Sequence, residues 1–227
     1  MSRQDPGQPD ATPNGNAGLT QRPAAHRLDT RTAILRSART LLEEHGYHGV
    51  GLAEVARAAG LSRQAVYLHF GSKRGLLLAL VDWVDQIEGL EELLTVARSA
   101  PSAIAALDAI VHLTAVYTPR IYRLAAVLEV ARRSDPDFDA AWQDRMAHRR
   151  GNMGAVVKWL ADGGGLADGM SVKSGTDIVW TMLSVHVFED LVVDRGWSTE
   201  RYQAFVGDVL HHRLLPPDVD DGPKPRP

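Results

Sequence analysis

The stretch that decides the fold is Leu52-Ala-Glu-Val-Ala-Arg-Ala-Ala-Gly60-Leu-Ser62-Arg-Gln-Ala-Val-Tyr67-Leu-His-Phe70. Its first half has the spacing of a short helix with Leu52 and Val55 facing inward. Gly60 then supplies the unusual backbone angle that a tight turn needs. Ser62 is a favourable N-cap for a second helix. The pattern predicts a helix-turn-helix over residues 52–70.

The second of these helices carries the polar groups that a DNA-reading helix requires. Its apolar positions, Ala65 or Val66 together with Phe70, can face the core. Arg can donate two hydrogen bonds to guanine, and Gln can pair bidentately with adenine, each contributing roughly 1–3 kcal/mol of discrimination. Tyr67 can reach phosphate or pack, and for His69 the two roles are equally plausible. The predicted DNA contacts are Ser62, Arg63, Gln64, Tyr67, Leu68, His69 and Lys73.

The distribution of charge agrees with one DNA-binding end. The whole chain of 227 residues has a formal net charge of −3. Residues 27–80 nevertheless hold eight Lys or Arg against four Asp or Glu, whereas residues 81–227 hold fifteen against twenty-two. A basic head on an acidic body suits a protein that contacts phosphate at one end only.

The rest of the chain indicates an all-α fold. Apolar residues recur at helical spacing, and no run alternates as a strand would. We predict a disordered N-terminal arm over 1–26, a DNA-binding domain over 27–72, a ligand-binding and dimerisation domain over 73–215, and a disordered tail over 216–227. The predicted helices outside residues 52–70 cover about 30–45, a long segment after Ser72, 102–117, 119–134, 137–162, 174–195 and 198–212, with Ser174 capping the sixth.

These residues carry a family resemblance. The segment from about Thr30 to Leu80 resembles the DNA-binding domain of the TetR family of transcriptional regulators. The matching landmarks are Ile34-Leu35, Ala38, Gly46-Tyr47, Val55-Ala56, Ala59-Gly60, Tyr67-Leu68-His69-Phe70, Ser72-Lys73 and Leu76-Leu77. The family often begins its second helix with Thr or Ser where this chain has Gly51, and a Gly cap costs only a few tenths of a kcal/mol. We therefore expect no DNA contact from position 51.

The resemblance implies a three-helix DNA-binding domain followed by a larger helical bundle that binds a small molecule and dimerises through its last two helices. The strongly apolar segment 174–195 agrees with burial on nearly all sides. Bundles bind small molecules in mostly apolar cavities, so aromatic and His residues are the candidates for this pocket, although most can equally be core. They are Trp83, His112, Tyr117, Trp159, Trp180 and His186.

Other kinds of site find less support. With no cysteine there is no thiolate nucleophile and no Cys-ligated metal. His186 and Asp190 share a helical face but lack an obvious third metal ligand. Glu129 and Glu189 lie among apolar neighbours, yet no nucleophile and base accompany them. We expect no metal site, no cofactor and no catalysis.

We therefore expect a homodimeric regulator that binds a near-palindromic operator in double-stranded DNA and releases it when an effector of unknown identity binds. Repression is the usual output of the family, and activation stays open. A DNA-independent helical binding protein is the second possibility, and an enzyme that uses Glu129 or Glu189 is the third. The chain start lacks the layout of a signal peptide, and no apolar run reaches about 18 residues, so we expect a cytoplasmic protein with no membrane span.

Overall fold

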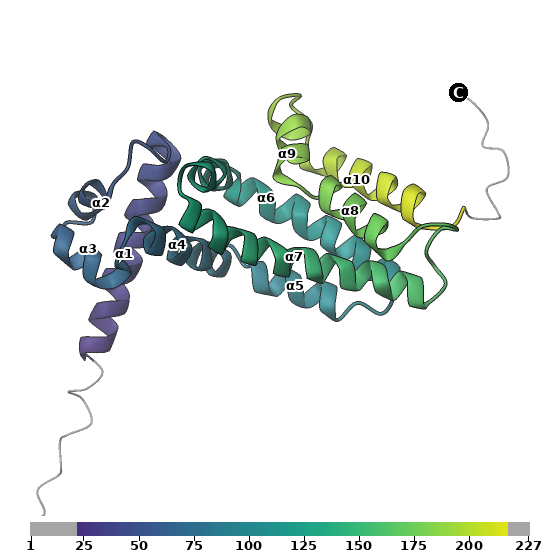
Figure 1. Cartoon of the computed structure of the whole chain (residues 1–227), viewed down its shortest axis with the longest axis horizontal. Coiled ribbons are helices and arrows are strands. Elements are labelled where there is room, and N and C mark those ends of the chain that lie inside the picture. Colours follow the sequence, from purple (N-terminus) through teal and green to yellow (C-terminus); the bar gives the residue numbers. More distant parts are fainter. Residues whose placement is uncertain (1–21, 218–227) are drawn as a thin grey trace, which may run out of the picture.

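The computed structural model describes residues 22–217, and every regular element in that range is a helix. The molecule is elongated, with a small head at one end and a larger body at the other (Figure 1). The predicted all-α class is confirmed. The head contains α1 (Arg22–His45), α2 (Leu52–Ala58) and α3 (Arg63–Phe70). The body contains α5 (Leu90–Arg98), α6 (Ala103–Ser134), α7 (Pro136–Asp162), α8 (Val172–Met182), α9 (Val185–Phe188), the π-helical turn η1 (Glu189–Val193) and α10 (Thr199–Leu214).

The N-terminal boundary differs from the prediction. α1 begins at Arg22, before the predicted start near Thr30, so residues 22–26 are helical instead of belonging to an irregular arm. The remainder of the predicted arm and residues 218–227 of the predicted tail lie outside the described residues.

Helix α4 (Lys73–Ile87) joins the head to the body. Ser72 caps it by accepting a hydrogen bond from the Gly75 amide at 3.0 Å. A Cβ atom at Gly75 would lie only 2.0 Å from the carbonyl oxygen of Phe70. The close approach of α4 to the end of α3 therefore requires glycine at position 75.

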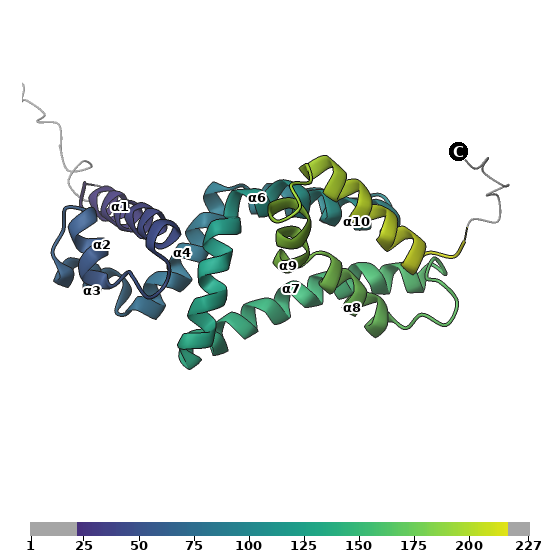
Figure 2. The same cartoon turned by 90° about the horizontal axis from the view of Figure 1, so that it is seen from above.

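Helix α6 corrects the prediction of two helices that meet at Pro119. The chain stays helical from Ala103 to Ser134 with Pro119 inside the helix. The axis bends sharply along its length (Figure 2). Proline lacks the amide that would bond to Ala115, and its ring crowds that carbonyl, so it kinks a helix that tertiary packing keeps intact.

The apolar segment predicted as one helix over 174–195 is broken. α8 begins after Ser171, whose hydroxyl accepts from the Ser174 amide at 3.1 Å, so Ser171 is the cap and not Ser174. The helix ends near Leu183, and Ser184 caps α9 by accepting from the Val187 amide at 3.3 Å. A capping serine inside an apolar run interrupts the helix because its side chain satisfies the amides of a new first turn.

Two groups of buried side chains hold the molecule together. The first joins residues of α1 to α4 to the second half of α6 and to Phe138 of α7. The second lies further along the body and includes Leu107, Val157, Tyr202 and Leu210. Because the first group spans head and body, α4 and α6 connect the two physically.

Candidate DNA-binding surface and ligand cavity

The turn between α2 and α3 has the predicted geometry. Gly60 has φ +69°, a left-handed conformation that favours glycine. The Leu61 amide donates to the Ala56 carbonyl at 2.8 Å, which closes the end of α2. The Ser62 hydroxyl accepts from the Ala65 amide at 3.1 Å, so the predicted N-cap is confirmed. The α2–α3 angle is therefore fixed by local bonds.

Helix α3 buries one face and exposes the other. Val66 is fully buried, whereas Tyr67 and Leu68 are 60% and 77% exposed. Arg63 and Gln64 in the first turn are also exposed. His69 is partly buried beside the Phe70 ring, with ring centroids 6.0 Å apart. The exposed face carries the predicted DNA contacts from Ser62 to Leu68.

Lys73 has a local partner that the sequence did not indicate. Its ammonium group donates to the Tyr47 carbonyl at 2.6 Å and lies 3.7 Å from the centroid of the Tyr47 ring. Burial lowers the pKa of Lys73. This side chain ties the loop after α1 to the start of α4.

Gly51 caps α2 without a side chain of its own. Its amide donates to Oε2 of Glu54 at 3.0 Å, so the carboxylate supplies the missing cap. Hydrogen bonds from its own backbone amide and then from that of Gly51 lower the pKa of Glu54. Position 51 therefore needs no hydroxyl for helix α2 to begin there.

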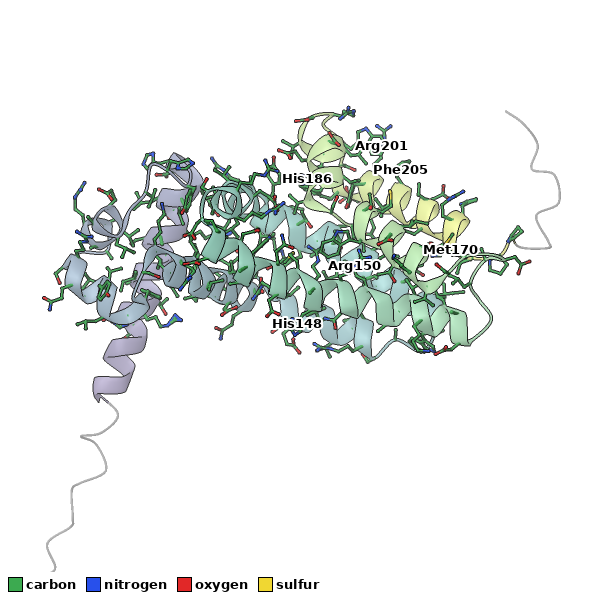
Figure 3. All side chains as sticks on the ribbon, viewed as in Figure 1. His148, Arg150, Met170, His186, Arg201 and Phe205 are labelled. Carbon is green, nitrogen blue, oxygen red and sulfur yellow. The ribbon has the colours of Figure 1, made fainter. Side chains whose placement is uncertain are left out.

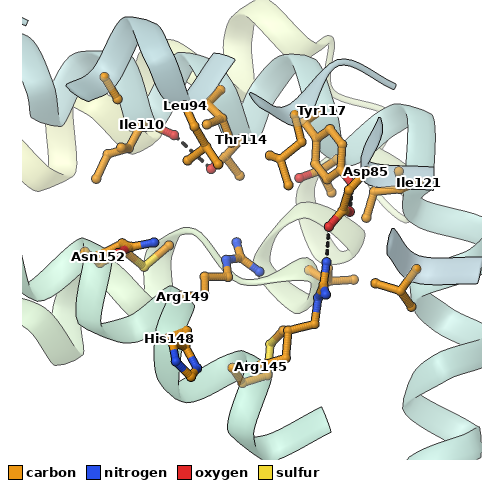
Figure 4. Close-up of a pocket in the computed structure, with 18 of the residues that line it drawn as sticks. Asp85, Leu94, Ile110, Thr114, Tyr117, Ile121, Arg145, His148, Arg149 and Asn152 are labelled. Carbon is orange, nitrogen blue, oxygen red and sulfur yellow. Dashed lines mark hydrogen bonds and ion pairs between the residues drawn. The ribbon is translucent and has the colours of Figure 1, made fainter. Parts of the chain in front are cut away.

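A cavity of about 760 Å³ lies in the body, lined mainly by α4, α5, α6 and α7. Figure 4 shows side chains from facing helices pointing into it. The prediction missed α5, which supplies Leu90, Leu94 and Ala97 to one wall. Apolar side chains form most of the remaining surface, with polar groups at a few positions. Such a composition is typical of small-molecule sites.

Two of the six predicted pocket residues, Tyr117 and Trp159, line this cavity. The other four lie elsewhere, because residue type alone does not tell a cavity wall from core or surface. Trp83 packs against the first buried group, and Trp180 packs against the second. His112 bonds to Gln203 of α10, with Nδ1 and Oε1 3.3 Å apart. His186 is exposed on α9 (Figure 3).

A polar cluster joins three helices at the head side of the cavity. The Tyr117 hydroxyl donates to Asp85, and Arg145 forms an ion pair with the same carboxylate. Arg145 also bonds to Asp82 at 2.8 Å. Burial raises the pKa of Asp85, and burial with this hydrogen bond raises the pKa of Tyr117 well above its usual range. No sequence spacing indicated this cluster, since its members come from α4, α6 and α7.

A second polar network links the head to the kinked helix. Nη1 of Arg39 in α1 donates to Glu88 at 2.6 Å, and Nη2 donates to the Arg120 carbonyl at 2.8 Å. Arg120 in turn donates to the Glu88 carbonyl at 2.7 Å. Glu88 directly follows α4, and Arg120 adjoins Pro119. A movement of α4 or α6 near the cavity would therefore disturb the hydrogen bonds that position α1.

The carboxylates considered for catalysis are engaged in ordinary contacts. Glu129 pairs with Arg132 at 2.8 Å, and Glu189 accepts from the Tyr122 hydroxyl at 2.5 Å. Over residues 22–217, no three His, Cys, Asp or Glu side chains gather as a metal site would require. In the same range, no helix combines the length and apolar character needed to cross a membrane.

Comparisons with known proteins agree with the geometry of the head. Residues 34–80 match the family model described as bacterial regulatory proteins, tetR family. Over 127 residues the chain is 32% identical to the HTH-type transcriptional repressor AcnR of Corynebacterium efficiens, covering 53% of this chain and 60% of that one. It is 31% identical over 128 residues to the repressor Rv1474c of Mycobacterium tuberculosis, covering 54% and 61%. The match thus spans about three fifths of the length of these relatives.

Solved structures share the whole arrangement of helices. A putative regulator from Saccharomonospora viridis, determined in complex with choline, superposes with a TM-score of 0.69 at 17% identity, covering 82% of this chain and 98% of that one. NalD, the secondary repressor of an efflux pump in Pseudomonas aeruginosa, gives 0.63 at 21% identity over 86% and 98%. These likenesses establish the fold: an N-terminal helix-turn-helix head and a C-terminal helical domain. With the match of residues 34–80, the chain is similar in its head to the TetR family of transcriptional regulators.

Proposed function

We propose that this protein is a sequence-specific DNA-binding repressor whose operator affinity falls when a small molecule occupies the cavity of the body. The observation that carries the proposal is the exposed Arg63–Gln64 pair in the first turn of α3. Both are residue types that recognise bases bidentately. They stand on a helix whose orientation is held by Gly60, Ser62 and the buried Val66.

The remaining side chains of the α3 face have positioning roles in this proposal. Ser62 lies at the helix N-terminus, where backbone amides favour phosphate. Tyr67 and His69 offer donors to the DNA backbone, and Leu68 can contact the methyl group of thymine. Lys73 is already held by the Tyr47 carbonyl. We therefore propose that Lys73 mainly orients the head and only secondarily contacts phosphate.

Two copies would place two α3 helices in successive major grooves of a near-palindromic operator, with half-sites about 34–36 Å apart or a multiple of that. The outer side of α8 and α10 is the proposed contact between copies. Phe205 of α10 is 40% exposed there and packs edge-on against Trp197, with ring centroids 5.4 Å apart. Large aromatic side chains left on a surface are typical of protein interfaces.

Coupling between cavity and head would run through α4 and α6. Val84 and Asp85 of α4 and Ile121 of α6 line the cavity. Arg39 of α1 bonds to Glu88, directly after α4, and to the carbonyl of Arg120, beside Ile121. An effector that favours another spacing of α4 and α6 would lower operator affinity by its own preference for that state. We place the protein in the cytoplasm, where DNA is accessible, and assign it no catalytic activity.

Operator binding is tested by selecting duplexes from a random library and measuring their affinity at several salt concentrations. We expect a near-palindromic selected sequence and an affinity that falls steeply with salt. A protein that bound no duplex with salt dependence would instead be a DNA-independent helical binding protein. For substitutions on the α3 face, Arg57→Ala is the matched control, because Arg57 is exposed on α2 and lies outside that face.

A further inference from the structure

Arg149 of α7 stands apart from the other charged groups of the cavity. Its side chain points from α7 into the cavity (Figure 4). Nη2 donates to the Leu183 carbonyl at 3.1 Å, and the guanidinium lies 5.7 Å from the centroid of the Trp180 ring. Within residues 22–217, no carboxylate comes within ion-pair distance of it.

The other arginines that line the cavity do have carboxylate partners. Arg145 is paired with Asp82 and Asp85. Arg98 is paired with Glu91 at 2.5 Å. Arg149 thus differs from both in forming no ion pair, although the more distant Asp85 still favours its charged form.

A partly buried charge without an ion pair is costly. Burial lowers the pKa of Arg149, yet a guanidinium stays protonated in proteins. Removing a cation from water costs several kcal/mol unless an anion and further hydrogen bonds compensate for it. The carbonyl of Leu183 and the ring of Trp180 supply only part of that compensation, and most donors of the planar guanidinium remain available. A bound carboxylate would complete it through two parallel hydrogen bonds.

The surroundings of Arg149 restrict the rest of the ligand. Leu94, Ile110 and Met153 line the same cavity, and so does Asn152, whose amide offers a further donor three residues along α7. A volume of about 760 Å³ accommodates a drug-sized molecule. Trp159, which also lines the cavity, is 43% exposed.

We propose that the effector is a carboxylate with an apolar body, held through its anionic end by Arg149 and through its apolar part by α5 and α6. The proposal names the ligand class of the cavity and so rests on the proposed function. A neutral or cationic molecule of the same shape would leave Arg149 unpaired and would bind more weakly.

The test uses matched straight-chain probes on the full-length protein: octanoate and decanoate against 1-octanol, 1-decanol and decylamine at neutral pH. Binding is measured by tryptophan fluorescence, since Trp142 and Trp159 line the cavity, and by thermal shift. We expect each carboxylate to bind roughly 10- to 100-fold more tightly than the alcohol of equal length, the range expected of charge-assisted hydrogen bonds. Equal binding of the pair, or no carboxylate binding at all, would overturn the proposal.

Substitutions assign the preference to one residue. Arg149→Met should abolish the preference for carboxylate over alcohol and leave alcohol binding nearly unchanged, whereas Arg149→Lys should retain part of it. Arg150→Met is the control, because Arg150 pairs with Asp177 and does not line the cavity. A preference that survives in Arg149→Met would contradict the assignment. If Arg149→Met does not fold, the carboxylate preference of Arg149→Lys is compared with that of the wild type. A weaker preference supports the assignment to Arg149, and an unchanged preference contradicts it.

The two proposals fail separately. Ligand binding is measured without DNA, and operator binding without ligand. Loss of the carboxylate preference with intact operator binding would overturn only the ligand class. A carboxylate preference in a protein that binds no operator would overturn the proposed function.

Discussion

The head and the body place their functional groups in opposite ways. In the head, the exposed face of α3 comes from one continuous stretch, and local hydrogen bonds fix its orientation. In the body, the cavity wall comes from α4, α5, α6 and α7, which are brought together by tertiary packing. A site built on local signals can be recognised from spacing, whereas a site built by long-range packing cannot.

The two regions also treat charge differently. The head displays Arg63 to solvent for an external partner. The body instead holds partly buried charge along its cavity, in the Asp85–Arg145 pair and in Arg149. Substitutions on the head surface should therefore change DNA binding with little effect on stability, and substitutions in the core between the regions should do the reverse.

The largest effect is expected from Phe138→Ala. Phe138 is fully buried in the group that joins the head to α6, and it stacks on Trp142 with ring centroids 6.0 Å apart. Loss of a buried phenyl ring should lower the free energy of unfolding by about 3–5 kcal/mol, measured by urea denaturation. Tyr67→Ala is the control, and as an exposed aromatic it should change stability by only about 0.5 kcal/mol. Similar losses of unfolding free energy in both variants would contradict the assignment of Phe138 to the core and of Tyr67 to the surface.

Gly75→Ala tests the junction of α3 and α4. The new Cβ would meet the carbonyl oxygen of Phe70 at 2.0 Å, so we expect a loss of about 1–3 kcal/mol through backbone displacement. Gly151→Ala provides the control, because Gly151 lies within α7 with open space at its Cβ position. The free energy of unfolding of that variant, measured by thermal denaturation, should rise by about 0.5–1 kcal/mol. A Gly75→Ala protein of normal stability would show that the close approach is not required.

Arg39→Ala tests the link between the regions. Its hydrogen bonds to Glu88 and to the Arg120 carbonyl would be lost, which should cost about 1–2 kcal/mol for this partly exposed group. A ligand that releases the wild type from DNA should release the variant less completely. The exposed Arg57, whose contact with Glu54 is 3.6 Å long, can be replaced by Ala with almost no effect. Unchanged ligand response in Arg39→Ala would exclude this network from the coupling.

The smallest effect concerns Lys73. Because its ammonium is committed to the Tyr47 carbonyl and ring, Lys73→Met should cost about 1 kcal/mol of stability. It should leave the slope of log affinity against log salt almost unaltered. A slope reduced by about one would instead identify a direct phosphate contact.

The sequence was sufficient for the head because its signals act over a few residues. The positive φ of Gly60, the cap at Ser62 and the exposure of Arg63 each follow from residue type and spacing. Local signals failed where tertiary packing prevails. Packing keeps α6 helical through Pro119, and the early start of α1 at Arg22 precedes any capping residue that the sequence indicated.

The cavity was the least predictable part. Of the aromatic and His residues that the sequence suggested, Tyr117 and Trp159 line the cavity, whereas His186 is exposed on α9. Arg149 looks like an ordinary surface arginine beside Arg150 in the sequence. Its proposed role depends on its having no ion pair among the described helices, and no linear pattern encodes that arrangement.

The most direct test of the DNA-binding assignment is the affinity of Arg63→Ala for a panel of operators that differ by single base pairs. We predict that its affinity for the preferred operator falls by about 1–3 kcal/mol per contact and that the base preference at one position of each half-site disappears, while stability is unchanged. Unaltered affinity and an unaltered preference at every position would contradict the assignment of α3 as the helix that reads the operator.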